Sequence, residues 1–386
     1  MRRRGVEGCS GARRVPHGFS AGHGSCSAGR YANWGSMKKK ILFIGGTMGG
    51  GVATINNEVI KIFENAGHRC ALVDTEAMKQ RVPVPIATWA IFSSIRYLFC
   101  YGAALAKIVF LRPSVVYLQL TQTGYLHQSI FLLIAKLFRR ETIAHFHADA
   151  DLEGTCTKAQ LGRILFSRKY TDKMIVLTKP CKESLSRAGW KKDIYVIPNF
   201  INAERLPADF RPARERSQLL YIGRMSGEKG IFEVLEVADL MPEERFVFVG
   251  KFADQRTRTE FTQKLERASN ADWLGPIWAD EKFRVIAESR LLIFPTRQDL
   301  FPVTLIESSI LGCVPLVSRV GSVGEIIKDG YNGFYISPDD VEGIVARIVE
   351  LRDGEKLQRL SENGIEYARN HFTNRAVEKH LLEIVG

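Results

Sequence analysis

The chain has 386 residues, more than one ordinary hydrophobic core organises, and its 45% hydrophobic and 25% charged residues are typical of a soluble globular protein with two domains. The 7 cysteines are scattered and form no CxxC pair, so neither a disulfide framework nor a zinc finger is indicated, and a reducing cytosol fits. Residues 1–36 have a net charge of +5, residues 37–200 a net charge of +12, and the rest −5, so the first half favours phosphorylated ligands, nucleic acid or an anionic membrane as partners.

Residues 1–36 are rich in Gly, Ser and Arg and lack apolar periodicity. We expect a leader outside the fold, either a disordered segment or an extension upstream of the natural start; an Arg-rich, acid-poor transit peptide is a further alternative. Met37 begins the stretch MKKKILFIGG, which reads like a natural start, and its apolar run is too short for a secretory signal.

After Met37, short apolar strands alternate with segments of helix length, beginning with a strand at 41–46 and a helix at 55–68 that ends at Gly67. Such alternation predicts a parallel sheet with helices on both faces. The further strands expected in this first set are 70–75, 114–120, 141–147, 173–178 and 194–199.

A glycine loop over 45–51 separates the first strand from the first helix. Glycine lets the backbone approach a phosphate or a sugar closely, and Gly50 and Gly51 are candidate donor-binding residues. The loop does not fit the dinucleotide pattern GxGxxG, because Thr47 occupies its second glycine, although Asp74 ends the second strand as that pattern requires.

Residues 86–110 form a long apolar run that Arg96 and Lys107 interrupt. On a helix both cations share one face with Cys100, and Leu98 lies on the opposite face. Two cations on one face argue against a membrane span. We expect either a helix packed on the sheet with its polar stripe in solvent or, given the basic half-chain around it, an amphipathic helix on a membrane surface.

His145, His147, Asp149 and Asp151 alternate at the end of the fourth expected strand. HxH and DxD can each be parts of a metal site, but a metal would need further ligands, and only His371 and His380 follow. His147 at a strand end fits better as a hydrogen-bond partner for a sugar hydroxyl, so no metal is expected.

A second set of strands is expected at 219–224, 245–250, 271–275, 291–296, 314–318 and 333–337. The fold class is therefore α/β, with two doubly wound Rossmann-like domains whose ligands lie beyond the carboxyl ends of the strands, in the cleft between domains. The expected boundaries are 37–200 for the first domain, 201–217 for a polar linker, 218–365 for the second domain and 366–386 for C-terminal helices that return toward the first domain.

The first strand of the second set ends in Gly223 and Arg224, and Lys229 precedes a helix. Cations placed there can stabilise a departing diphosphate in place of a metal. Composition alone would favour two ordinary surface cations.

The stretch RQDLFPVTLIESSILGCVPLVS at 297–318 contains two acids eight positions apart, Asp299 and Glu307. Pro302 suits the first helical turn, so the free amides of Val303 and Thr304 would offer an anion site. A diphosphate at the helix start, a ribose on Glu307 and sugar hydroxyls on Asp299 would together suit a nucleotide-sugar. Alternatively, Glu307 belongs to a solvated stripe with Ser308.

These residues as a set resemble the retaining glycosyltransferases of family 4, which have the GT-B fold, and the resemblance covers nearly everything from Met37 onward. It implies that Arg224 and Lys229 contact the donor diphosphate, Asp299 the donor sugar, Glu307 the ribose, and His147 the region near the sugar. The family's GFP segment corresponds to Leu300, Phe301 and Pro302, its glycine loop to 49–51, its "vIPNG" stretch to VIPNF at 196–200, and its "GG…E" helix start to GSVGE at 321–325. Two departures are Asp299 in place of Glu and Leu300 in place of Gly.

The resemblance implies transfer of a sugar from a nucleoside diphosphate, UDP or GDP, to a hydroxyl with retention of configuration and without a cofactor. The expected acceptor is a glycan or a lipid-linked glycan, at a cytoplasmic location that includes the inner face of a membrane. The alternatives are a nucleotide-sugar epimerase or phosphorylase of the same architecture, and a metal-dependent hydrolase that uses His145 and His147. A basic nucleic-acid-binding protein is disfavoured because no binding motif of that class is present.

Overall fold

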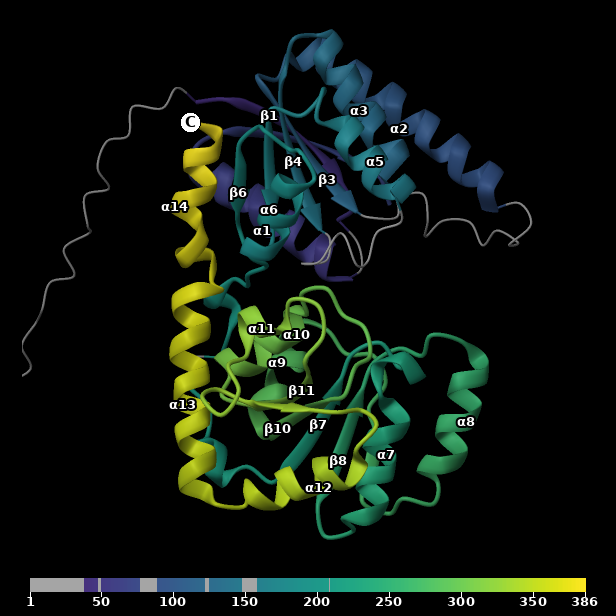
Figure 1. The fold of residues 1–386 in the computed structure, drawn as a ribbon, viewed down its shortest axis with the longest axis vertical. Coiled ribbons are helices and arrows are strands. Elements are labelled where there is room, and N and C mark those ends of the chain that lie inside the picture. Colours follow the sequence, from purple (N-terminus) through teal and green to yellow (C-terminus); the bar gives the residue numbers. More distant parts are fainter. Residues whose placement is uncertain (1–37, 48–49, 77–88, 122–124, 148–157, 208) are drawn as a thin grey trace, which may run out of the picture. The chain divides into compact units, whose positions relative to one another are not determined.

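The computed structural model describes residues 38–47, 50–76, 89–121, 125–147, 158–207 and 209–386. The expected leader, Asp149 and Asp151 lie outside these residues. The described part contains two six-stranded sheets in which all strand pairs are parallel, with helices between the strands (Figure 1). This arrangement confirms the predicted α/β class.

The first sheet has the strand order β2-β1-β3-β4-β5-β6. Its strands are β1 (Lys40–Gly45), β2 (Arg69–Asp74), β3 (Val115–Thr121), β4 (Glu141–His147), β5 (Lys173–Val176) and β6 (Ile194–Val196). The central strands are continuous apolar runs because both of their faces are covered. Along β1, Ile41 and Phe43 point into one core, and Leu42 and Ile44 point into the other.

Helices cover the two faces of the first sheet differently. The core on one face includes side chains of α2 (Trp89–Leu111), α3 (Tyr125–Leu137), α5 (Lys158–Ser167) and α6 (Lys179–Arg187). The core on the other face includes α1 (Gly50–Asn65) and the C-terminal helix α14 (Asn374–Val385). Helix α1 thus begins at Gly50, earlier than the expected start at residue 55, and includes the end of the glycine loop.

Helix α14 brings the end of the chain back to the first sheet. Its residues Val377 and Leu381 are buried in the same core as Ile41 and Phe43. Lys39 Nζ donates to the Val385 carbonyl at 2.5 Å, and Lys173 Nζ donates to the Ile384 carbonyl at 2.6 Å. Cations at a helix C-terminus satisfy its free carbonyls and complement its dipole. The packing of α14 therefore depends on both sheet contacts and end charges.

Helix α2 faces the sheet with the opposite side from the one expected. Arg96 is 5% exposed and Cys100 is buried, and Lys107 donates to the Leu72 carbonyl at 2.5 Å. Leu98 and Leu105 are exposed. They lie on the opposite face, which would be buried if the polar stripe were in solvent. The expectation of a solvated polar stripe is therefore wrong: Lys107 reaches the edge strand β2, the Arg96 guanidinium lies 4.8 Å from the centre of the Tyr97 ring, and Cys100 and Ala104 pack into the core. None of the described helices is apolar over a length that would cross a membrane.

The second sheet has the strand order β12-β11-β10-β7-β8-β9. Its strands are β7 (Gln218–Ile222), β8 (Arg245–Val249), β9 (Ala271–Trp273), β10 (Ser289–Phe294), β11 (Val314–Ser318) and β12 (Phe334–Ile336). Its helices are α7 (Ile231–Leu240), α8 (Gln255–Leu265), α9 (Ala279–Glu288), α10 (Val303–Ile310), α11 (Val323–Ile326), α12 (Val341–Glu350) and α13 (Gly354–His371). One continuous core underlies them.

The segment between the sheets is more ordered than a polar linker. It contains two 3-10 turns, η2 (Ala203–Arg205) and η3 (Ala213–Glu215). Arg216 is 5% exposed and donates to the Ser289 carbonyl at 3.0 Å. The Ile201 amide donates to the Phe372 carbonyl at 3.0 Å, which ties this crossing to the end of α13. The chain passes between the two sheets twice, near Ile201 and near Phe372, and this hydrogen bond joins the two segments.

Candidate functional site

The candidate residues of the second half gather at the carboxyl end of its sheet. Strands β7 and β10 are neighbours, and the loops that follow them carry Arg224, Lys229 and Asp299. Loops that leave adjacent parallel strands at the same edge are where doubly wound sheets hold ligands. The strand order therefore brings together groups that are 70 positions apart in the chain, Lys229 and Asp299.

Lys229 and Asp299 form an ion pair in this structure. Lys229 Nζ lies 2.7 Å from Asp299 Oδ2, and the same amine donates to the Gln298 carbonyl. Both side chains are about one-fifth exposed. Gly230 fixes the lysine loop against the end of β10: its φ is 77°, and a Cβ there would lie 2.3 Å from the Pro295 carbonyl oxygen. Only glycine fits that position, which explains the KG pair.

Arg224, the other cation expected to bind the diphosphate, is exposed. Its carbonyl accepts a hydrogen bond from the Tyr221 hydroxyl at 2.9 Å, which holds the backbone at the end of β7. Within the described residues its guanidinium has no ion-pair partner. Gly223 is half-buried, and a Cβ there would lie 3.3 Å from the Phe294 ring. Among the described residues, the loop after β7 therefore offers one paired cation, Lys229, and one cation without an ion-pair partner, Arg224.

The backbone of 299–302 is held by groups distant in the chain. Ser322 N donates to the Leu300 carbonyl at 2.9 Å, and Asn199 Nδ2 donates to the Phe301 carbonyl at 3.0 Å. Gly321 has φ 51°, and a Cβ there would lie 2.0 Å from the Asp299 carbonyl oxygen. The carbonyl groups of Leu300 and Phe301 therefore hold this segment in place. Leu300, where the family pattern has Gly, has no positive φ, so its backbone conformation does not require Gly.

Helix α10 begins one residue later than expected. Pro302 occupies the N-cap position with φ −71°, and Val303 is the first helical residue. No side chain caps this end. The first amides of a helix have no partner within it, and the dipole makes its start attractive to anions. Val303 and Thr304 are half-buried, so their amides suit a phosphate oxygen.

Glu307 is buried on α10, with 3% of its surface exposed. Its Oε1 accepts from Lys282 Nζ of α9, and its Oε2 has no partner among the described residues. Burial raises the pKa of Glu307, and the charges of Lys282 and Arg205 oppose that rise. The reading of Glu307 as part of a solvated stripe with Ser308 is wrong, because both side chains are buried. Glu307 therefore has one carboxylate oxygen available for a ligand.

The glycine loop of the first half lies close to the start of α10. A Cβ at Gly51 would lie 3.3 Å from Val303 Cγ2. Gly50 is the first residue of α1. Asp74 accepts from the Thr47 hydroxyl and, at 2.8 Å, from the Glu76 amide, so the acid that a dinucleotide site would use engages its own loop.

The two histidines of β4 are buried side by side. Their ring centroids are 4.3 Å apart, and the Tyr117 hydroxyl lies 2.8 Å from His145 Nδ1. Neither nitrogen of His147 has a hydrogen-bond partner among the described residues. Burial lowers the pKa of His147 to about 4 and that of His145 well below its ordinary value, the latter also because of His147. Both rings are therefore neutral at physiological pH.

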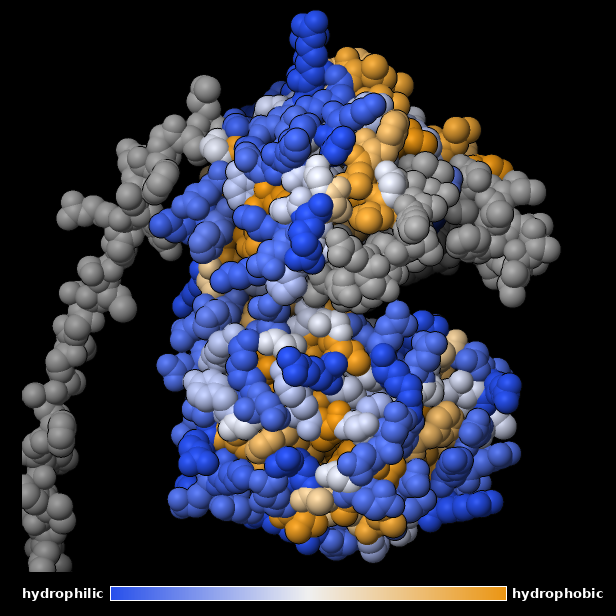
Figure 2. All heavy atoms as spheres, viewed as in Figure 1, coloured by the Kyte–Doolittle hydropathy of each residue, from blue (hydrophilic) through white to orange (hydrophobic). Residues whose placement is uncertain are grey.

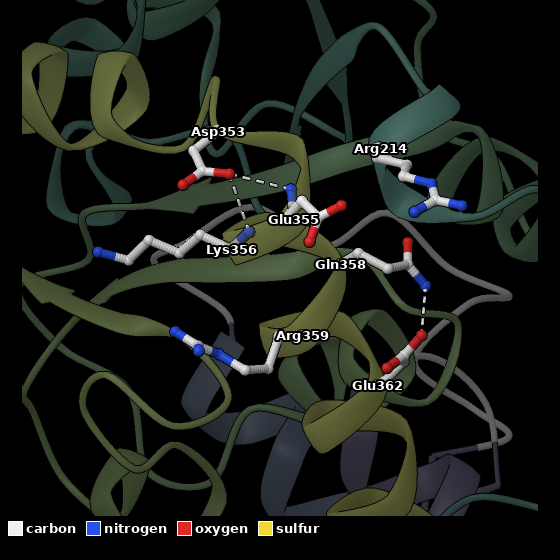
Figure 3. Close-up of a pocket in the computed structure, with 7 residues that line it drawn as sticks. All are labelled: Arg214, Asp353, Glu355, Lys356, Gln358, Arg359 and Glu362. Carbon is white, nitrogen blue, oxygen red and sulfur yellow. Dashed lines mark hydrogen bonds between the residues drawn. The ribbon is translucent and has the colours of Figure 1, made fainter.

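The described residues contain no group of three or more His, Cys, Asp or Glu side chains arranged to hold a metal ion. A pocket of about 490 Å³ lies at the start of α13, away from the residues expected to bind the donor (Figure 3). Its side chains are all charged or polar: Asp353 Oδ1 accepts from the backbone amides of Glu355 and Lys356 at 3.0 and 3.1 Å, and Gln358 Nε2 donates to Glu362 Oε1 at 2.9 Å. This pocket therefore reflects a helix cap rather than the candidate site.

Three residues of the site were not predicted. Asn199 was noted only within the stretch VIPNF, without a role. Lys282 contacts Glu307 from a helix 25 residues away in sequence. Arg205 lies 3.9 Å from Glu58 of α1 and also influences Glu307. No local pattern marks the latter two, because an ion pair across helices has no fixed spacing.

Known proteins resemble this chain in two ways. The model of the family Glycosyl transferases group 1 matches residues 202–370. An uncharacterized glycosyltransferase of Methanocaldococcus jannaschii is 27% identical over 56% of this chain and 60% of its own length, and a glycogen synthase of Mycobacterium tuberculosis is 25% identical over 42% of this chain and 40% of its own length. The lipopolysaccharide core biosynthesis glycosyltransferase LpsE of Rhizobium meliloti is 23% identical over 56% of this chain and 64% of its own. The chain thus spans less than two thirds of each of these relatives.

Solved structures extend the likeness to the whole fold. HepE of Anabaena, in a crystal with UDP and glucose, superposes with a TM-score of 0.69 at 15% identity and covers 90% of this chain and 99% of its own. Sucrose-phosphate synthase of Thermosynechococcus elongatus superposes with a TM-score of 0.69 at 15% identity, covering 90% of this chain and 98% of its own. The chain therefore has the predicted GT-B fold, with two facing Rossmann-like halves.

Proposed function

We propose that the protein is a glycosyltransferase that moves a sugar, a hexose, from a nucleoside diphosphate to a hydroxyl with retention of configuration. The observation that carries this proposal is the meeting of Lys229 with Asp299 at the carboxyl edge of the second sheet, beside the uncapped start of α10. The match of residues 202–370 to the group 1 glycosyl transferases, and relatives that are glycosyltransferases, support the same activity.

The donor diphosphate would lie between the two cations and the start of α10. Negative charge grows on the diphosphate as the bond to the sugar breaks, and Arg224, Lys229 and the amides of Val303 and Thr304 would stabilise it. Fixed arginine, lysine and backbone amide groups can stabilise the negative charge of a departing diphosphate. A phosphate that draws Lys229 toward itself would also loosen its pair with Asp299, which frees that carboxylate for the sugar.

The rest of the donor would extend to either side. Glu307, with Oε2 unpartnered among the described residues, suits the hydroxyls of a ribose. Asp299 and His147 suit hydroxyls of the sugar, and a neutral His147 can donate one hydrogen bond and accept another. The reacting sugar acquires oxocarbenium character, so closing the site against water would prevent loss of the donor by hydrolysis.

We further propose that the donor is a UDP- or GDP-sugar and that the acceptor is a glycan or a lipid-linked glycan in the synthesis of a cell-surface polysaccharide or glycolipid. A solved structure of this fold contains UDP-glucose, and a relative acts in lipopolysaccharide core synthesis, which supports both choices. The protein would then work in the cytoplasm or at the inner face of the membrane.

A thermal-shift panel of nucleoside diphosphates and their sugars tests this proposal. A ligand at about 100 times its dissociation constant stabilises the folded state by about 2.7 kcal/mol. Arg224→Ala and Glu307→Ala should each reduce the shift, whereas Lys379→Ala, at a side chain that is 75% exposed on α14, should not. Product analysis with a labelled donor then separates transfer from epimerisation, and no shift with any donor would contradict the proposal.

A further inference from the structure

The first half of the protein presents an unusual apolar surface. Eleven of the 17 large hydrophobic side chains that are exposed among the described residues lie between 95 and 138. We call the α2–α3 apolar surface the set that includes Leu98 (71% exposed), Phe99 and Phe110 (83%) of α2 and Leu133 and Leu137 (72%) of α3. Figure 2 shows apolar atoms gathered over the part of the molecule where Figure 1 places these helices. A concentration of this kind marks an interaction site.

The two helices form one continuous support for this surface. The Tyr97 ring stacks on the His127 ring at 4.8 Å, and the Tyr101 hydroxyl donates to the His127 carbonyl at 2.9 Å. On the opposite side of α2, Ala104 and Ile108 are buried against the sheet. The exposed face is therefore the outer side of a packed helix pair and is not an unfilled part of the core.

The segment that carries the α2–α3 apolar surface contains cations and no carboxylate of its own, and Lys136 of α3 pairs with Asp172 from outside that segment. From 77 to 140 the sequence contains 8 Lys and Arg and no Asp or Glu. Exposed cations follow the ends of both helices, at Arg112 after α2 and at Arg139 after α3. A surface that combines apolar side chains with cations and lacks carboxylates is complementary to anionic groups above an apolar layer.

The backbone at these two arginines gives a second, independent indication. Arg112 has φ 48° and Arg139 has φ 53°, and they are the only described residues other than glycine with positive φ. Each follows the end of a helix, where glycine or asparagine usually occupies the left-handed conformation without strain. Residues kept in a strained conformation often serve function. The fold thus retains a cation at two positions where glycine would be easier to accommodate.

We propose that the α2–α3 apolar surface, with Arg112 and Arg139, docks on the interface of an anionic phospholipid bilayer. Its apolar side chains would enter the acyl boundary while its cations contact phosphate groups, and no helix would cross the bilayer. A second copy of the chain is a poor occupant, because a two-fold interface would place the same carboxylate-free surface against itself. The proposal stands independently of glycosyl transfer.

Sedimentation of the intact protein with vesicles tests the proposal. Vesicles of phosphatidylcholine alone are compared with vesicles that also contain phosphatidylglycerol, at low and high salt. We expect binding to the anionic vesicles, weaker binding at high salt, and little binding to phosphatidylcholine alone. Failure to bind the anionic vesicles at low salt would overturn the proposal.

Variants separate docking from folding. Leu98→Glu should weaken vesicle binding by about tenfold or more, because the bilayer would have to accept a carboxylate where the unchanged protein inserts an apolar side chain. Leu240→Glu is the matched control, since Leu240 is 54% exposed on α7 of the second half, and it should bind like the unchanged protein. Equal binding by Leu98→Glu and the unchanged protein would contradict the proposal.

The arginines offer a test that misfolding cannot mimic. The double substitution Arg112→Gly and Arg139→Gly should keep or raise the melting temperature, because glycine relieves the strain, yet weaken anionic vesicle binding by about fivefold for each lost cation. Sedimentation velocity is measured in parallel. The proposal would be overturned if the unchanged protein did not bind vesicles but formed a dimer that Leu98→Glu dissociates. That result would assign the surface to self-association.

Discussion

The two halves of the candidate site hold their polar groups in opposite ways. In the second half, Lys229 pairs with Asp299 and Lys282 pairs with Glu307, so each acid has a cation beside it. In the first half, His145 and His147 are buried, and His147 has no hydrogen-bond partner among the described residues. The first arrangement places a cation against each acid, and the second lowers the pKa of the buried rings, which keeps them neutral at neutral pH.

This difference assigns different tasks to the two halves. In the proposed function, the positive charge at a diphosphate would come from Arg224 and Lys229, because burial lowers the pKa of His147 to about 4 and keeps its ring neutral at neutral pH. The first half contributes neutral hydrogen-bonding groups and a close glycine backbone at Gly51. Each prediction below changes one side of this comparison.

The largest effect is expected at Lys229. Lys229→Ala removes the paired cation, and the rate of transfer from a nucleotide-sugar should fall by about a thousandfold, as for the loss of one preorganised charge-stabilising group. Initial rates with a labelled donor measure it, and Lys379→Ala is the control. A fall of less than about tenfold would mean that Lys229 does not face the developing charge.

The histidines should make the protein sensitive to acid. A buried histidine whose pKa is lowered to about 4 contributes stability that is complete above its unfolded pKa of about 6.5 and is lost as pH falls toward 4; for His147 the loss is about 3 kcal/mol. His147→Phe cannot take up the proton, so its stability should fall less over the same range. Urea unfolding at several pH values compares the two, and parallel curves would contradict this assignment.

Glu307 should show the opposite dependence on pH. Burial raises the pKa of Glu307, so its contribution to the free energy of unfolding is fully present below its ordinary pKa. That contribution is lost as pH rises through the raised pKa. Glu307→Gln should therefore lose less stability than the unchanged protein as pH rises, while it reduces the thermal shift with nucleoside diphosphates. The assigned role would be contradicted if Glu307→Gln were less stable than the unchanged protein at high pH, or if its thermal shift with nucleoside diphosphates were not reduced.

The smallest effect concerns the contact that joins the halves. Asn199→Ala removes the 3.0 Å hydrogen bond to the Phe301 carbonyl, which leaves that buried acceptor unpaired and should cost about 1–2 kcal/mol of folding free energy. Denaturant unfolding measures the loss. Asn202→Ala, at the cap of the exposed turn η2, is a comparison that should cost less. An unchanged stability in Asn199→Ala would show that this bond does not hold the segment in place.

Most of the fold could be predicted from the sequence because buried parallel strands are continuous apolar runs. The strand expected at 141–147 coincides with β4, and the one at 314–318 coincides with β11. Helix α2 shows where such reasoning fails. Its cations were assigned to solvent, yet Lys107 reaches the Leu72 carbonyl, because a long side chain can satisfy its charge at a sheet edge while its stem packs.

The site could be predicted only in part. The sequence pattern placed Lys229 and Asp299 among the candidate residues, and the order of neighbouring strands explains why they lie together, while their roles stay predictions. The burial of Glu307 and its pairing with Lys282 could not be predicted, because they depend on how α9 and α10 pack. The roles of Arg224, His147 and the glycine loop remain predictions that ligand-bound structures and variants will decide.

A crystal structure of the protein with UDP or GDP tests the central claim most directly. The account predicts that the diphosphate contacts Lys229 and the amides of Val303 and Thr304, with the ribose on Glu307 and with Asp299 released from Lys229. A nucleotide bound at another place in the molecule, with the Lys229–Asp299 pair intact and the start of α10 unoccupied, would contradict it.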